Sequence, residues 1–163
     1  MDPKKIIPFF LIFFLFLLQN SVGLIFPQKT PVLLLCGVLF YAFSEGPWFG
    51  ALLGAYAGLL LEVFTTGRLG SEMMVLAATG FIFGRGTRIF FGESLFMRFL
   101  MPLLAFYFSV FFRFLLFYAF SGEGQAFGIF RNHLLLWDTL GLLVACPVVF
   151  SFLKKVSYGL SKS

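Results

Sequence analysis

Four glycines recur at every fourth position in the apolar segment GPWFGALLGAYAGLLLE, namely Gly46, Gly50, Gly54 and Gly58. Residues four apart lie on the same side of an α-helix, so these glycines form a ridge without side chains. In lipid, helices associate through close van der Waals packing, which small residues permit. Because each glycine costs a helix about 1 kcal/mol relative to alanine, the ladder predicts a packing surface. Its occupant is another helix of this chain, a partner protein, or both.

Composition places the whole chain in a membrane. Hydrophobic residues make up 60% of the 163 positions, 27 residues are phenylalanine, and the mean hydropathy is +0.99. A transmembrane helix needs about 20 mostly apolar residues, so the chain has room for about five to seven spans and for no soluble domain. We therefore expect one polytopic membrane domain of the all-α class over residues 1–163.

The apolar runs predict a compact bundle of six transmembrane helices. Their approximate ranges are 6–26, 31–43, 47–64, 73–84, 97–120 and 133–153. The second and third are separated at residues 44–47, because Gly46 and Pro47 favour a tight turn. The second, third and fourth helices are short for a bilayer, so they need cover from longer neighbours.

Lysine and arginine are distributed unevenly between the two sides of this bundle. With both chain ends in the cytoplasm, the cytoplasmic side receives Lys4, Lys5, Arg85, Arg88, Arg98, Lys154, Lys155 and Lys162, and the outer side receives Lys29, Arg68 and Arg131. Cytoplasmic loops of membrane proteins carry the excess of positive residues. The pattern predicts cytoplasmic termini, and topology accounts for the positive charge without a nucleic-acid partner.

The sequence offers no arrangement that supports catalysis. Nucleophilic catalysis needs Ser or Cys with a base in reach, and the only histidine, His133, lies five positions before Asp138, on a different face of a helix. Cys36 and Cys146 lie in separate apolar runs, where a thiol behaves as a small hydrophobe. No cluster of His, Cys and carboxylates has metal-ligand spacing. We expect no enzyme, no cofactor and no bound metal.

Three ionisable residues fall inside predicted spans, and all three lie in the outer half of the membrane: Glu62, Arg113 and Asp138. Each costs about 2.5 to 3.5 kcal/mol at a bilayer centre, so each should face inward and find a partner. We predict that Arg113 pairs with Glu62, with Asp138, or with both, which would join the third, fifth and sixth helices. Such a cluster is either structural or part of a ligand or ion pathway.

The predicted inner connection, RGTRIFFGESLFMR at residues 85–98, mixes Arg85, Arg88 and Arg98 with large apolar side chains. Ordinary positive charge on the cytoplasmic side accounts for this pattern. The same pattern also fits a segment that lies along the membrane surface and contacts anionic headgroups or a cytoplasmic partner.

The order of these features resembles the MreD family of rod shape-determining membrane proteins of bacteria. The similarity is clearest over residues 31–92. There, a proline-led apolar span precedes a glycine-stepped helix that closes on Glu62, and a Gly-containing outer loop leads to a span that ends in GFIFGR. The C-terminal PVVFSFLKKV, residues 147–156, is also similar to the family, whereas residues 93–146 match in hydropathy and size.

The resemblance implies a non-enzymatic scaffold of the cell-elongation machinery in the inner membrane, with no small-molecule substrate. Its partner would be the bitopic protein MreC, and through MreC the actin-like MreB and the peptidoglycan polymerase and transpeptidase. The implied fold is a six-helix bundle similar to the substrate-binding subunits of energy-coupling-factor vitamin transporters.

Two other function classes remain. A transporter subunit of that fold is the alternative, although its pocket needs several convergent polar groups. The first helix here, IIPFFLIFFLFLL, also has bulky residues where those subunits resemble one another in having small ones. A channel or ion-coupled carrier would need a polar pore-lining face or inverted repeats, and the sequence has neither.

Overall fold

The structure is a computed structural model that describes residues 3–25, 31–64, 70–90, 95–121 and 136–161. Within these ranges the chain forms six α-helices and no strand. The helices are α1 (Pro3–Ile25), α2 (Val32–Glu45), α3 (Pro47–Phe64), α4 (Ser71–Phe90), α5 (Leu95–Ser121) and α7 (Leu136–Ser161). The predicted all-α class is therefore confirmed for the described residues.

All six predicted helices are present, and α3 has the predicted bounds. By contrast, α4 and α7 are longer than predicted, since they continue to Phe90 and Ser161. The prediction of a loop at residues 85–98 is wrong for residues 85–90 and 95–98, which are helical. Residues 91–94 lie outside the described part. The loop was predicted because the apolar run ends near residue 84 and Gly86 follows. A single glycine, however, costs a helix only about 1 kcal/mol and does not end it.

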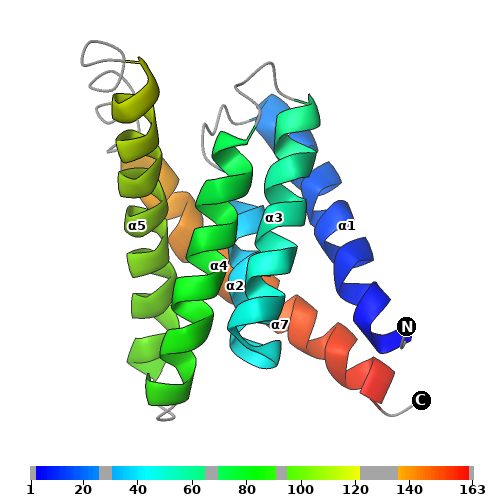
Figure 1. The fold of residues 1–163 in the computed structure, drawn as a ribbon. Coiled ribbons are helices and arrows are strands. Elements are labelled where there is room, and N and C mark those ends of the chain that lie inside the picture. The colour runs from blue at the N-terminus through cyan, green and yellow to red at the C-terminus, as the bar shows by residue number, and fades with distance from the viewer. Residues whose placement is uncertain (1–2, 26–30, 65–69, 91–94, 122–135, 162–163) are drawn as a thin grey trace.

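The helices run alternately up and down the bundle (Figure 1). The start of α1 and the end of α7 lie at one end of it, together with the turn between α2 and α3. We call this the termini end; the start of α4 lies at the opposite end. The central helix is α2, which contacts each of the other five described helices. Its residues are apolar all round, as expected of a helix that is buried on every side, and Leu34, Cys36, Val38 and Leu39 are fully buried.

The turn between α2 and α3 consists of Gly46 alone. Its φ of 105° lies in the left-handed region, which favours glycine. The Gly46 N–H donates to the Ala42 carbonyl at 3.2 Å. Pro47 then begins α3 at a position where a missing N–H costs nothing. The predicted break at residues 44–47 is therefore narrower in the structure, because Ser44 and Glu45 remain helical.

The outer surface of the bundle carries many large apolar side chains. Phe10, Phe111 and Val148 are 72%, 56% and 63% exposed. Exposed apolar surface on this scale marks a membrane or an interaction site. Among the described residues, one helix, Pro47–Phe64, is long and apolar enough to cross a membrane by itself. Shorter apolar stretches occur at Ile6–Ser21, Val32–Glu45 and Leu100–Leu116.

Candidate functional site

The glycine ridge of α3 packs against the backbone of α4. A Cβ added to Gly54 would lie 2.6 Å from the carbonyl carbon of Leu76, and one added to Gly58 would lie 2.7 Å from that of Glu72. Real Cβ atoms essentially never approach closer than 3.0 Å. A side chain at these positions would collide with the backbone of α4, which cannot rotate away as a side chain can.

The facing side of α4 carries glycines of its own. A Cβ on Gly80 would lie 2.7 Å from the carbonyl carbon of Gly50, and one on Gly84 would lie 2.8 Å from the Cα of Pro47. The two backbones thus approach each other closely along much of their length. Gly46 is not part of this contact, since a Cβ there would meet nothing within 4 Å. The buried ridge, Gly50, Gly54 and Gly58, is occupied by α4 of the same chain, and Gly50 also contacts Ala42 of α2.

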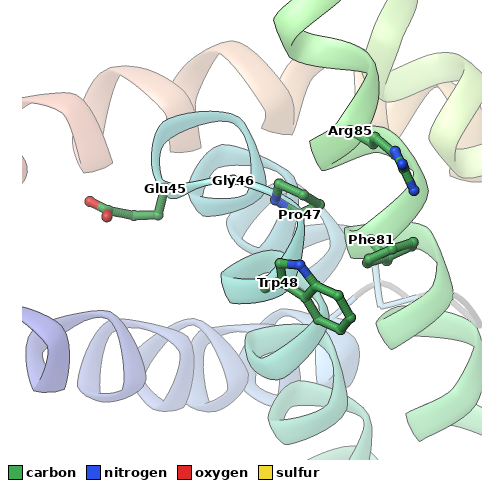
Figure 2. A pocket seen from close by; sticks show the side chains of 6 residues that line it. All are labelled: Glu45, Gly46, Pro47, Trp48, Phe81 and Arg85. Atoms are coloured by element: carbon green, nitrogen blue, oxygen red, sulfur yellow. The ribbon is translucent and has the colours of Figure 1, made fainter.

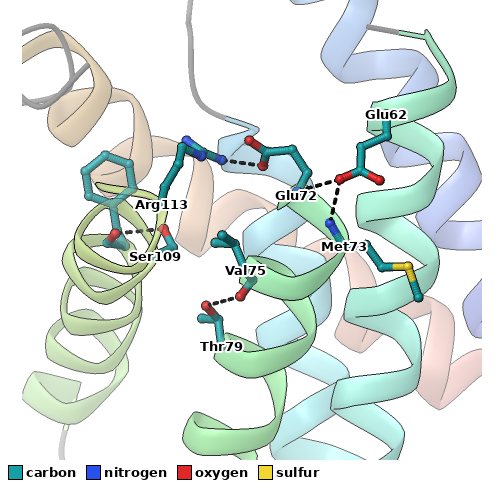
Figure 3. Close-up of polar contacts among 8 residues, drawn as sticks. Glu62, Glu72, Met73, Val75, Thr79, Ser109 and Arg113 are labelled. Carbon is teal, nitrogen blue, oxygen red and sulfur yellow. Dashed lines mark hydrogen bonds and ion pairs between the residues drawn. The ribbon is translucent and has the colours of Figure 1, made fainter. Parts of the chain in front are cut away.

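Glu62, near the end of α3, caps the start of α4 (Figure 3). Its Oε2 accepts the Gly70 N–H at 2.7 Å. Its Oε1 accepts the N–H groups of Glu72 and Met73 at 2.6 and 3.1 Å. The first N–H groups of a helix have no partner within the helix, and a negative charge is favourable there. Glu62, which is 6% exposed, therefore fixes α3 to α4 at the opposite end of the bundle.

Arg113 of α5 forms an ion pair with Glu72 of α4 (Figure 3). The two side chains are 7% and 26% exposed. Arg113 was predicted to pair with Glu62, with Asp138, or with both. The pair with Glu62 is wrong, because the ion pair that the described residues form is with Glu72 and Glu62 accepts backbone N–H groups instead. The pair with Asp138 stays a prediction, since that side chain lies outside the described part. Glu72 links Arg113 and Glu62: its N–H donates to Glu62 and its carboxylate accepts from Arg113. The Arg113 Nε is buried without a hydrogen-bond partner in the described structure.

A pocket of about 420 Å³ opens at the termini end, beside the turn between α2 and α3 (Figure 2). Its lining consists of Glu45, Gly46, Pro47, Trp48, Phe81 and Arg85. The rings of Trp48 and Phe81 lie edge to face, with centroids 5.2 Å apart and planes at 67°. Arg85 reaches the pocket from α4, whereas the Glu45 carboxylate points away from the other lining side chains.

The sequence profile of the family described as rod shape-determining protein MreD matches residues 3–156. The chain belongs to the MreD family. MreD proteins are membrane proteins of the system that determines rod shape, and this role extends to the present chain. The resemblance seen in the sequence is thereby confirmed. No curated protein and no solved structure matches the chain. The likeness to energy-coupling-factor subunits therefore stays a prediction.

Two residues that build this MreD bundle were not identified from the sequence. Glu72 falls just before the predicted start of the fourth helix at residue 73. Gln19 accepts the Leu33 N–H on its Oε1 at 2.8 Å and so satisfies an amide at the start of α2. For Gln19, the available signal is a polar residue toward the end of an apolar helix that a second helix follows. For Glu72, it is an acidic residue in the first turn of a helix. Three predicted residues, Arg88, Arg98 and Asp138, lie in α4, α5 and α7, but their side chains lie outside the described part.

The contacts that the structure describes in this MreD chain are those of helix packing and helix capping. Among the residues that the structure describes, no three His, Cys, Asp or Glu side chains are grouped so that they could hold a metal ion. Cys36 of α2 and Cys146 of α7 are free thiols buried in the same apolar core. The capped and closely packed α3 and α4 form one unit, and the Arg113 ion pair attaches α5 to it.

Proposed function

We propose that this chain is a non-enzymatic scaffold that crosses the bacterial cytoplasmic membrane six times, with both termini in the cytoplasm. The family membership, the alternating helices and the apolar outer surface support this topology. The length of α2, 14 residues, corresponds to only about 21 Å at 1.5 Å per residue. This helix lies at the bundle centre, so it meets protein rather than lipid and needs no full-length span.

The proposed partner is MreC, bound by helix packing, and through it MreB and the peptidoglycan polymerase and transpeptidase. Because α4 occupies the glycine ridge, a partner helix needs another face. On α5, one exposed stripe consists of Leu104, Tyr107, Phe111, Leu115 and Tyr118, which we call the α5 stripe. These residues recur at steps of three or four and are 46% to 56% exposed.

The α5 stripe is the observation that carries the proposal. Steps of three and four place side chains along one side of a helix, which is the pattern that receives a second helix. Its tyrosines combine large apolar rings with hydroxyls that bond well at interfaces. In Figure 1, α5 lies at the edge of the bundle, so a transmembrane helix could run beside it.

The test is purification of the tagged protein from its native membranes in mild detergent. We expect wild type to bring down MreC and the elongation synthases. The double variant Phe111→Ala, Leu115→Ala should lower MreC recovery by about tenfold or more, as the loss of two central contact residues does. The matched control is Phe10→Ala, Phe14→Ala on α1, where both side chains are also exposed, and it should retain MreC.

The other outcomes separate the alternatives. If the α5 and α1 variants retain MreC equally, the α5 stripe is not the interface. If wild type recovers no MreC, the scaffold proposal fails. Recovery of ATPase subunits or of a bound vitamin would identify a transporter subunit instead.

A further inference from the structure

We propose that the pocket beside the turn between α2 and α3 binds the phosphate-bearing headgroup of an anionic phospholipid. The proposal rests on the membrane topology proposed above and not on the identity of the protein partner. It follows from the charge of the pocket, from its aromatic wall, and from the apolar side chains that continue from it along α3 and α4.

Arg85 provides the positive charge of the pocket. Its side chain is exposed, and it forms no ion pair with any residue that the structure describes. A guanidinium donates parallel hydrogen bonds to phosphate oxygens, which makes arginine well suited to phosphate groups. The acidic lining residue, Glu45, directs its carboxylate away from the Arg85 side of the pocket in Figure 2. The Arg85 side of the pocket is therefore complementary to an anion.

The aromatic wall of the pocket suits the boundary between membrane and water. Trp48 is 79% exposed and contacts Phe81 edge to face. Tryptophan is enriched at the level of the lipid headgroups, where its ring is half in apolar and half in polar surroundings. The proposed orientation puts the pocket at the cytoplasmic boundary, because it lies at the termini end.

Apolar side chains continue from the pocket toward the middle of the bundle. Leu52 lies one turn after Trp48 on α3 and is 56% exposed. Ile82 lies one turn before Arg85 on α4 and is 47% exposed. Since α3 runs away from the termini end and α4 runs toward it, both residues lie deeper in the bilayer than the pocket. An acyl chain would cover them, whereas a free phosphate would not, and this favours a lipid.

The size of the pocket is also suitable. A volume of about 420 Å³ lies within the range of about 300 to 1,000 Å³ that is typical of ligand pockets. A phosphodiester headgroup fits in this space, and the acyl chains remain outside along α3 and α4.

Trp48 allows a direct measurement. The chain has two tryptophans, so Trp137→Phe leaves Trp48 as the only one. This variant is reconstituted in phosphatidylcholine vesicles that contain phosphatidylglycerol brominated near the ester end of its chains. The quenching of Trp48 fluorescence in these vesicles is compared with the quenching in vesicles that contain brominated phosphatidylcholine instead. We expect preferential quenching by phosphatidylglycerol.

In the same background, Arg85→Gln should lower this preference about fivefold, the factor for one basic residue near an anionic surface. The matched control is Lys155→Gln, which removes an exposed cation of α7 that does not line the pocket, and it should keep the preference.

Several results would overturn the proposal. Equal quenching by the two lipids in the parent variant would show no anionic-lipid site. An equal loss of the preference for phosphatidylglycerol in the Arg85 and Lys155 variants would mean that the lipid is attracted by the overall positive charge of this end and not by the pocket. Abolition of the preference by excess inorganic phosphate would indicate a site for the free anion, and equal preference for brominated phosphatidylethanolamine would indicate a zwitterionic headgroup. Because no MreC is present, a negative result here is distinct from failure of the scaffold proposal.

Discussion

Substitution of Gly54 by alanine separates two effects of opposite sign. In an isolated helix, alanine is favoured over glycine by about 1 kcal/mol, so propensity alone predicts a more stable protein. In this bundle, the new methyl carbon would lie 2.6 Å from the Leu76 carbonyl carbon and 2.9 Å from the Ala77 nitrogen. The Leu76 carbonyl oxygen would lie closer still. Ordinary contact begins at 3.4 Å, so the two backbones must separate by at least about 0.8 Å.

The energetic cost follows from this separation. A gap of 0.5 to 1 Å forfeits about a quarter to a half of the dispersion energy of each contact along the interface. Overpacking costs about 1 to 3 kcal/mol, and rigid backbone places Gly54→Ala near the upper end of that range. The separation also strains the bonds from Glu62 to the start of α4, which join the same two helices. After subtraction of the gain in helix propensity, we expect the free energy of unfolding to fall by about 2 kcal/mol.

Unfolding of the detergent-solubilised protein by titration with sodium dodecyl sulfate, followed by circular dichroism, measures this loss. The matched control is Gly37→Ala, another buried glycine within a helix. A Cβ there would meet only the flexible ends of side chains, Leu15 Cδ1 at 2.6 Å and Ile12 Cδ1 at 3.0 Å, and these can rotate away. We expect the control to lose less stability. A Gly54→Ala protein as stable as wild type would refute the packing argument.

Three further outcomes test the polar contacts and the position of α7. Glu62→Leu leaves three amides at the start of α4 without acceptors, so it should lower the free energy of unfolding by about 3 kcal/mol or more in the same titration. Glu62→Gln should have an intermediate effect. A leucine variant as stable as wild type would contradict the capping role. Glu72→Leu should cost about 3 to 5 kcal/mol because it leaves the buried Arg113 guanidinium without a counter-charge. Arg113→Leu should cost less, since the carboxylate that it strands is 26% exposed, and the double variant should recover part of the loss; equal single costs would argue against this account. Copper-phenanthroline oxidation in membranes should join Cys36 to Cys146, because α2 packs against α7 and both thiols belong to the same buried core. The bridge is detected as a mobility change that either serine variant abolishes, and its absence would argue against a direct contact between the two thiols.

The helices could be predicted because apolar runs and Gly-Pro breaks are local properties of the sequence. The occupant of the glycine ridge is a long-range property. A signal for it was nevertheless present, since Gly80 and Gly84 of α4 also lie four residues apart and provide the reciprocal surface. The glycine pattern of one helix does not show which other helix packs against it, because several helices contain small residues.

The partner of Arg113 was missed for a related reason. The predicted fourth helix begins at residue 73, whereas α4 begins at Ser71. This shift of two residues moves Glu72 from a connection into the first turn of a helix, where an acidic residue is favourable. Hydropathy marks the apolar part of a span, and the polar turns that extend a helix beyond it have to be recognised from capping instead.

The two ends of the bundle differ in a way that bears on the scaffold proposal. At the opposite end, Gln19 and Glu62 each sit near the end of one helix and accept amides at the start of the next, in the α1–α2 and α3–α4 pairs. Near lipid, unsatisfied amides are costly, so this capping fixes the ends of both helix pairs. At the termini end, by contrast, Glu45, Trp48 and Arg85 are exposed beside a one-residue turn. In the proposed orientation, internal bonds join both helix pairs at the outer end, and the cytoplasmic end presents exposed side chains for contact with lipid or protein.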